Sequence, residues 1–132
     1  MANQHDQLQA SCFQHIWNEY PNLRYLCFTT RNNLTSQLED RQAQIRMSQM
    51  KAMGTIKGST DLVFFYAGRL YGFDMKVAAD KLSKEQNEFL DALRRQGGGG
   101  CEIRSLEQFK AEVECILENG CLTKEFSDVE QA

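Results

Sequence analysis

The 132-residue chain has the size and composition of a single soluble globular domain, with 42% hydrophobic and 25% charged residues. No apolar run approaches the roughly 18 residues that span a bilayer, and the start MANQHDQLQ lacks the charged and apolar regions of a signal peptide. These features exclude a membrane-spanning protein, and we expect a cytoplasmic one without a membrane partner.

The net charge of -3 is unevenly distributed along the chain. Residues 22–104 carry thirteen basic and nine acidic side chains, a net charge of +4, whereas residues 105–132 carry two basic and seven acidic ones, a net charge of -5. A basic body can follow phosphate groups while an acidic tail faces solvent. A mixed, solvated surface explains the charges equally well.

The cysteines are odd in number and contain no C-x-x-C pair. This pattern favours free or buried thiols in a reducing compartment over a disulfide framework or a zinc site. The five residues are Cys12, Cys27, Cys101, Cys115 and Cys121.

Three elements are predicted before residue 55. Apolar residues at helical spacing predict a helix over 7–20, which Pro21 ends, and a short apolar run predicts a strand over 25–29. After a polar loop at 31–37, good helix formers predict a helix over 38–53 that Gly54 ends. We expect Trp17 and the series Met47, Met50 and Met53 to belong to the core.

A hairpin is predicted over 61–77. Two aromatic and β-branched runs, 62–66 and 70–73, flank Gly68. With Ala67 and Gly68 as the turn, Tyr66 pairs with Arg69, and counting outwards places Asp61 opposite Asp74. Directly opposed residues have Cβ atoms roughly 4.5 to 5.5 Å apart, so this carboxylate pair needs a cation or a proton between its members.

Strand alternation places Asp74 and Lys76 on one face of the sheet and Met75 on the other. An ordinary structural interpretation also fits this spacing: Asp61 would begin a strand after a turn, and Asp74 and Lys76 would form a solvent-facing pair on an edge strand.

After the hairpin, a helix is predicted over 83–96 and the four glycines of 97–100 end it. A strand over 101–104 and a helix over 105–118 follow, and residues from Asn119 are expected to fray. Each helix begins with a capping box, S-x-x-E/Q, at Ser83 to Gln86 and at Ser105 to Gln108. The element order αβ(α)ββαβα predicts an α/β fold, a small mixed β-sheet flanked by helices.

Residues 54–109 read GTIKGSTDLVFFYAGRLYGFDMKVAADKLSKEQNEFLDALRRQGGGGCEIRSLEQF. This segment resembles the VRR-NUC family of PD-(D/E)XK nucleases, in particular its small stand-alone phage and bacterial members. The family pattern is a glycine-containing loop, Pro-Asp and a strand, a short turn, a strand ending in Glu-x-Lys, a helix opening Leu-Ser-x-x-Gln, and an Arg-Ser-Leu step. The upstream segments TRNNLTSQ and RMSQMKAMG are similar to the family's Asn-containing loop and the following helix end. The matching positions are Gly58, Asp61, Asp74, Lys76, Leu82, Ser83, Gln86 and Arg104 to Leu106.

The resemblance implies a restriction-endonuclease-like core in a single nuclease domain over 1–132, with 119–132 as a frayed acidic tail. It implies a divalent-metal-dependent endonuclease, a hydrolase of phosphodiester bonds, in which Asp61, Asp74 and the Met75 backbone carbonyl hold Mg²⁺ or Mn²⁺. Lys76 would orient the attacking water and stabilise the transition state. Gln86 either only caps its helix or also reaches the site.

The chain departs from the family pattern in three places. Thr60 replaces a proline, which changes local backbone stiffness, and Asp74 stands where a Glu is more common. The first helix lacks the Glu that relatives place near the metal, and Gln4, His5 or Asp6 lies near that position, with Gln9 one turn later. His5 and Gln9 are therefore the candidate first-helix contributors, although surface or packed histidines are the simpler interpretation of His5 and His15.

By the resemblance, the substrate is DNA, branched or flapped as in Holliday junctions, cut during recombination or repair in a bacterial or phage-infected cell by a homodimer. A catalytically weak or inactive DNA-binding accessory module of the same fold is the alternative. Solvated helix faces or contacts to the DNA backbone equally explain the basic residues near the site, Arg41, Arg46, Lys51, Lys57 and Lys81.

Overall fold

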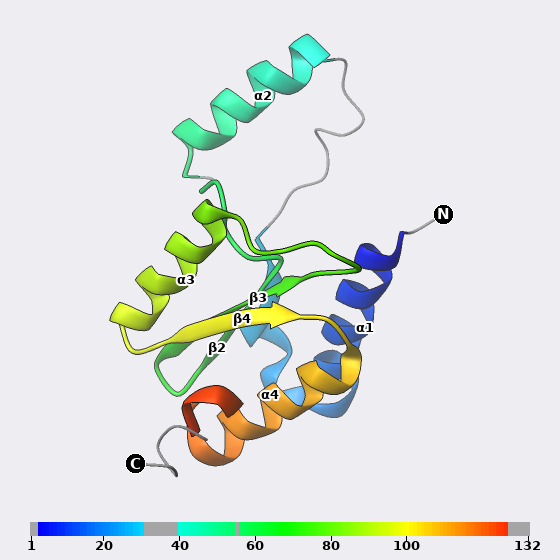
Figure 1. The fold of residues 1–132 in the computed structure, drawn as a ribbon, viewed down its shortest axis with the longest axis vertical. Coiled ribbons are helices and arrows are strands. Elements are labelled where there is room, and N and C mark those ends of the chain that lie inside the picture. Colours follow the sequence, from blue (N-terminus) through cyan, green and yellow to red (C-terminus); the bar gives the residue numbers. More distant parts are fainter. Residues whose placement is uncertain (1–2, 31–39, 55, 127–132) are drawn as a thin grey trace.

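A four-stranded sheet forms the centre of the molecule (Figure 1). The computed structural model describes residues 3–30, 40–54 and 56–126. The strands lie in the order β1 (Cys27–Thr29), β2 (Leu62–Tyr66), β3 (Arg69–Met75) and β4 (Gly99–Ile103). Neighbours are antiparallel except β3 and β4, which are parallel. The mixed α/β sheet that the sequence predicts is confirmed.

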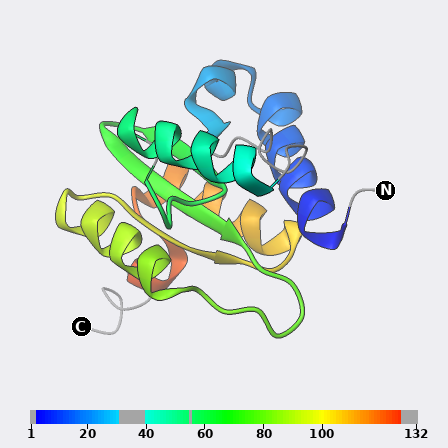
Figure 2. The same ribbon diagram turned by 90° about the horizontal axis from the view of Figure 1, so that it is seen from above.

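Helices cover both faces of this sheet. Helices α1 (Gln4–Glu19) and α4 (Leu106–Asn119) pack together on one face, and α3 (Lys84–Arg95) lies against β3 and β4 on the other. Figure 2 shows α1 and α3 on opposite sides of the strands. Helix α2 (Asp40–Ala52) extends away from the rest of the molecule (Figure 1).

The core lies between the sheet and the α1/α4 layer. Tyr71, Phe73 and Met75, at alternate positions of β3, point into it, and the Phe73 ring meets Phe109 of α4 edge to face with centroids 5.3 Å apart. Because the odd-numbered β3 residues face this core, the even-numbered ones, Asp74 among them, face the α3 side. Met75 and Asp74 therefore lie on different faces, as the alternation predicts.

The hairpin turn confirms the predicted register. Tyr66 pairs with Arg69, and both turn residues have positive φ, 52° at Ala67 and 80° at Gly68. Two positive φ values are the signature of a type I′ turn, whose twist matches that of the flanking strands.

The glycine run is partly strand, which corrects the prediction that all four glycines end α3. β4 begins at Gly99 instead of residue 101. A Cβ atom on Gly100 would lie 2.1 Å from the backbone oxygen of Gly72 and 2.5 Å from Leu90 Cδ2. The two facing glycines, paired in the β3–β4 register, thus allow α3 to lie directly on the sheet with Leu90 and Leu93 filling the space.

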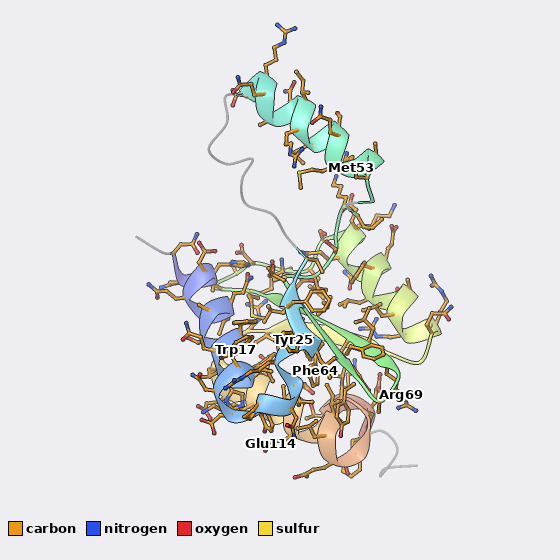
Figure 3. The ribbon with its side chains drawn as sticks, turned by 180° about the vertical axis from the view of Figure 1, so that it is seen from behind. Trp17, Tyr25, Met53, Phe64, Arg69 and Glu114 are labelled. Atoms are coloured by element: carbon orange, nitrogen blue, oxygen red, sulfur yellow. The ribbon has the colours of Figure 1, made fainter. Side chains whose placement is uncertain are left out.

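The segment after α1 also differs from the prediction. Pro21 opens a 3-10 helix, η1 (Pro21–Leu26), so the first strand is shorter than expected and Tyr25 is 91% exposed. Trp17 is not a core residue: it lies partly exposed on the surface (Figure 3). The guanidinium of Arg24 lies 5.1 Å from the centre of its ring.

Helix α2 has no buried residues. The expectation that its methionines belong to the core is therefore wrong, since Met47 is exposed and Met53, at the end of the helix in Figure 3, is 70% exposed. Methionine spacing alone does not create a core when no partner surface lies opposite. The loop predicted at 31–37 falls outside the described residues.

The first part of the expected tail is packed. Gly120, with φ 74°, ends α4, and its carbonyl accepts hydrogen bonds from Arg69 and from the Tyr71 hydroxyl. Leu122 is buried, and the buried carboxylate of Glu112 accepts from both the backbone N–H and the hydroxyl of Thr123. Within the described part of the chain, no helix is both long and apolar enough to cross a bilayer.

Candidate active site

The open end of the hairpin carries the carboxylate pair. The β2–β3 register runs out to Leu62 opposite Phe73, so Asp61 and Asp74 are the next residues facing each other. Both side chains are buried, 1% and 0% exposed. Burying two carboxylates costs several kcal/mol unless each is compensated, so the donors and cations around them define the chemistry of this site.

Neighbouring elements supply the compensating contacts. Asp61 Oδ2 accepts a hydrogen bond from the Met75 backbone N–H at 2.8 Å and lies 2.9 Å from His5 Nε2. Asp74 Oδ1 accepts from Gln86 Nε2 at 3.3 Å. The contacts of Asp61 therefore join the start of β2 to β3 and α1, and the contact between Asp74 and Gln86 joins β3 to α3.

Gln86 has both of the roles that the sequence leaves open. Its Oε1 accepts from the Ser83 backbone N–H at 2.9 Å, while the Ser83 hydroxyl accepts from the Gln86 N–H at 3.1 Å, which completes the capping box. Because Oε1 must face that N–H, the amide nitrogen is directed at Asp74. The cap thus fixes which end of the amide meets the carboxylate.

His5 is the first-helix residue that reaches the site. α1 begins at Gln4, three residues earlier than predicted, because the Asn3 side chain accepts from the Asp6 N–H and caps the helix. That extra turn carries the His5 ring to Asp61, so His5 is a packed, part-buried histidine that contacts the candidate site. An ionised Asp61 can only accept, so Nε2 carries the hydrogen. Gln9 instead contacts Thr29 Oγ1 at 3.4 Å.

Lys76 follows the last residue of β3 and lines an open hollow of about 390 Å³ with Gln4 and Leu8 of α1. Arg104, which also lines the hollow, donates to the backbone oxygens of Ala78 and Asp80 and to the Glu102 carboxylate. Arg104 therefore holds the 77–80 loop against the end of β4, and Lys76 is the second positively charged residue of the lining.

The other basic candidates lie on α2 and in the segments that flank the hairpin and α3. Arg41, Arg46 and Lys51 lie on the exposed helix α2, and Lys81 is exposed in the loop before α3. The Lys57 ammonium lies 3.5 Å from Glu85. A hydrogen bond from a backbone N–H at the start of α3, and then Lys57, lower the pKa of Glu85.

Thr60 does more than change the stiffness of the local backbone. Its side chain is fully buried and donates to the Leu62 carbonyl at 3.0 Å, while its own carbonyl accepts from the Thr30 hydroxyl at 2.6 Å. These bonds hold the backbone on either side of Asp61. The signal available in the sequence was only a threonine where the family pattern that the chain resembles has proline.

Oxygen atoms dominate this donor set, which suits a hard divalent cation such as Mg²⁺, commonly held by one or two carboxylates with water and substrate phosphate. Within the described ranges, no group of three His, Cys, Asp or Glu side chains is arranged to hold a metal ion. The residues present thus fit a two-carboxylate site and not a cage made entirely of protein ligands.

Comparisons with known proteins add information about the fold. No protein-family model and no curated protein matches the chain. A solved structure named "VRR_NUC domain protein" superposes on it with a TM-score of 0.58 and 14% sequence identity, covering 81% of this chain and 82% of that one. At this identity the likeness concerns architecture, and the chain therefore has the fold of a VRR_NUC domain.

Proposed function

We propose that this chain is a divalent-metal-dependent endonuclease that hydrolyses phosphodiester bonds of structured DNA, such as branched or flapped molecules. The observation that carries the proposal is the buried carboxylate pair, Asp61 and Asp74, at the open end of the hairpin. Two facing acids are costly for stability, and a metal site gives a reason for them. The VRR_NUC fold supports a nuclease over other metal-dependent activities.

Asp61 and Asp74 would hold Mg²⁺ or Mn²⁺ together with the Met75 carbonyl. The Met75 N–H points to Asp61, whereas the next N–H, of Lys76, bonds to Ile103 of β4. In an extended strand the N–H and C=O of one residue point the same way, so the Met75 carbonyl faces the Asp61 side. When bound, the cation lowers the pKa of a coordinated water and neutralises charge on the phosphoryl oxygens.

The protein's own residues would do the remaining work. His5 and Gln86 hold the carboxylates in position, so that each keeps one orientation. Lys76 would orient the attacking water and stabilise the charge that develops on the phosphate. The basic residues Arg41, Arg46, Lys51, Lys57 and Lys81 would contact the DNA backbone away from the cut. Two symmetric cuts in a junction would require a homodimer.

Cleavage of labelled flap and four-way junction DNA tests this proposal. We expect cutting with Mg²⁺ or Mn²⁺, none with EDTA, and losses of at least about 100-fold in Asp61→Ala and Lys76→Ala. Asp80→Ala is the matched control, because Asp80 is exposed in the adjacent loop, and it should cut at the wild-type rate. Cutting by Asp61→Ala and Lys76→Ala at the wild-type rate would rule out the assignment.

A second candidate function is a DNA-binding module with weak or no catalysis. The observation that favours it is His5, which meets Asp61 where related chains bring a Glu. An imidazole supplies no negative charge, so the cation would be held less firmly. This candidate predicts salt-sensitive binding to branched DNA without metal-dependent turnover.

A further inference from the structure

A second hollow lies on the other side of the N-terminal part of α1, between this helix and the edge strand β1. Its volume is about 490 Å³, within the range of small-molecule sites. Among its lining residues are Asp6, Gln9 and Phe13 of α1, Phe28 and Thr29 of β1, and Leu62 of β2.

This hollow adjoins the carboxylate pair through two elements. On α1, Asp6 follows His5, whose ring contacts Asp61. On β2, Leu62 follows Asp61 directly, so their Cα atoms are about 3.8 Å apart. When a phosphate is bound at Asp61 and Asp74, the nucleotide that carries it can therefore reach the hollow.

The chemistry of the lining suits a neutral, planar group. The described lining residues include two phenylalanines and a leucine, one carboxylate, and no basic side chain, so a phosphate would be repelled. Gln9 and Asp6 present an amide and a carboxylate at the rim, and the Gln9 contact to Thr29 is long, 3.4 Å, so exchanging it costs little. Phe28, at the edge of the sheet, is 49% exposed.

We propose that this hollow binds one unpaired nucleobase of the strand whose phosphate lies at the carboxylate pair. The base contacts the aromatic lining. The Gln9 amide accepts or donates at the edge of the base, and the Asp6 carboxylate accepts from an exocyclic amino group. Phosphates are directed to the Lys76 hollow on the other side of α1. This inference rests on the proposed nuclease function and adds a reason for preferring substrates with unpaired nucleotides near the cut.

The test combines base removal with removal of the lining. A single abasic position is moved along a flap oligonucleotide, and binding is measured by fluorescence anisotropy with Ca²⁺ at fixed salt. We expect one position at which wild-type affinity falls at least about fivefold, the lower end for a base–aromatic contact. Phe28→Ala and Gln9→Ala should weaken binding of the intact flap similarly and be insensitive to that abasic position.

Phe65→Ala is the matched control, because Phe65 is an equally exposed phenylalanine on the neighbouring strand outside the hollow. Equal losses in Phe65→Ala and Phe28→Ala, or independent effects of the variants and the abasic position, would overturn the proposal. Thermal unfolding identifies any variant that fails to fold, and Gln9→Ala, on the helix surface, then decides the result. If the variants and the abasic position affect binding independently while the wild type still cuts DNA, only the base site is refuted. If their effects on binding are coupled but no DNA is cut, only the nuclease function is refuted.

Discussion

The two roles of Gln86 can be separated by comparing two single variants. Ser83→Ala removes only the helix cap, which costs about 1 kcal/mol of stability. Gln86→Ala removes the reciprocal cap bond, about 1 kcal/mol, and also the donor at 3.3 Å from the buried Asp74 carboxylate. Hydrogen bonds to charged groups contribute about 1.5 to 3 kcal/mol, so Gln86→Ala should cost about 2.5 to 4 kcal/mol.

Urea denaturation followed by circular dichroism, with EDTA at pH 7.5, measures both losses. Gln108→Ala is the control for activity: Gln108 has the same position relative to the cap in α4, but its amide donates to the Glu102 backbone carbonyl. Gln108→Ala should lower stability while cleavage is unchanged, whereas Gln86→Ala should lower both. If Gln86→Ala costs no more than Ser83→Ala, the contact with Asp74 does not stabilise the site.

Three further results are expected. Burial raises the pKa of Cys12 and of Cys27 to about 12. Neither thiol should therefore react with Ellman's reagent at pH 8 until urea is added. Reaction of either thiol in the native protein would contradict their burial. Desolvation, and then Lys110, lower the pKa of His15 below its usual 6.5, so the unfolded chain binds a proton that the folded one does not, and unfolding free energy should fall as pH drops below about 6.5. His15→Phe should flatten that slope in urea titrations at pH 5.5 and 7.5, and an unchanged slope would assign it to other groups. Gly100→Ala should destabilise by about 3 kcal/mol because its Cβ meets the Gly72 oxygen, and a wild-type midpoint in urea would refute the close approach.

The hairpin and the two later helices could be predicted because local chemistry determines them. The Ala67–Gly68 turn sets the register, and the register brings Asp61 and Asp74 together. A capping box at Ser83 begins α3 close to its predicted start, and the Ser105 side chain caps α4, although Gln108 Oε1 accepts from the Arg104 N–H and so does not complete the predicted second box. In each case the residues that determine the structure are neighbours in the sequence.

The features that the sequence missed depend on distant partners. Gly99 and Gly100 are typical of a loop in composition, yet they form a strand because they pair with Tyr71 and Gly72 of β3, and at Gly100 the Gly72 backbone and Leu90 leave no room for a side chain. The position of His5 depends on where α1 begins. The Asn3 cap starts the helix before the first residue of the apolar pattern, so that pattern could not reveal the start. Met53 is exposed because none of the described elements buries a residue of α2, which its spacing could not reveal.

A crystal soaked with Mn²⁺ tests the central claim, that the carboxylate pair is a metal site. The anomalous signal should place one ion between the Asp61 and Asp74 carboxylates, within about 2.5 Å of an oxygen from each, and the peak should be absent from an Asp74→Asn crystal. Absence of a peak at saturating Mn²⁺, or a peak that persists in Asp74→Asn, would contradict the account.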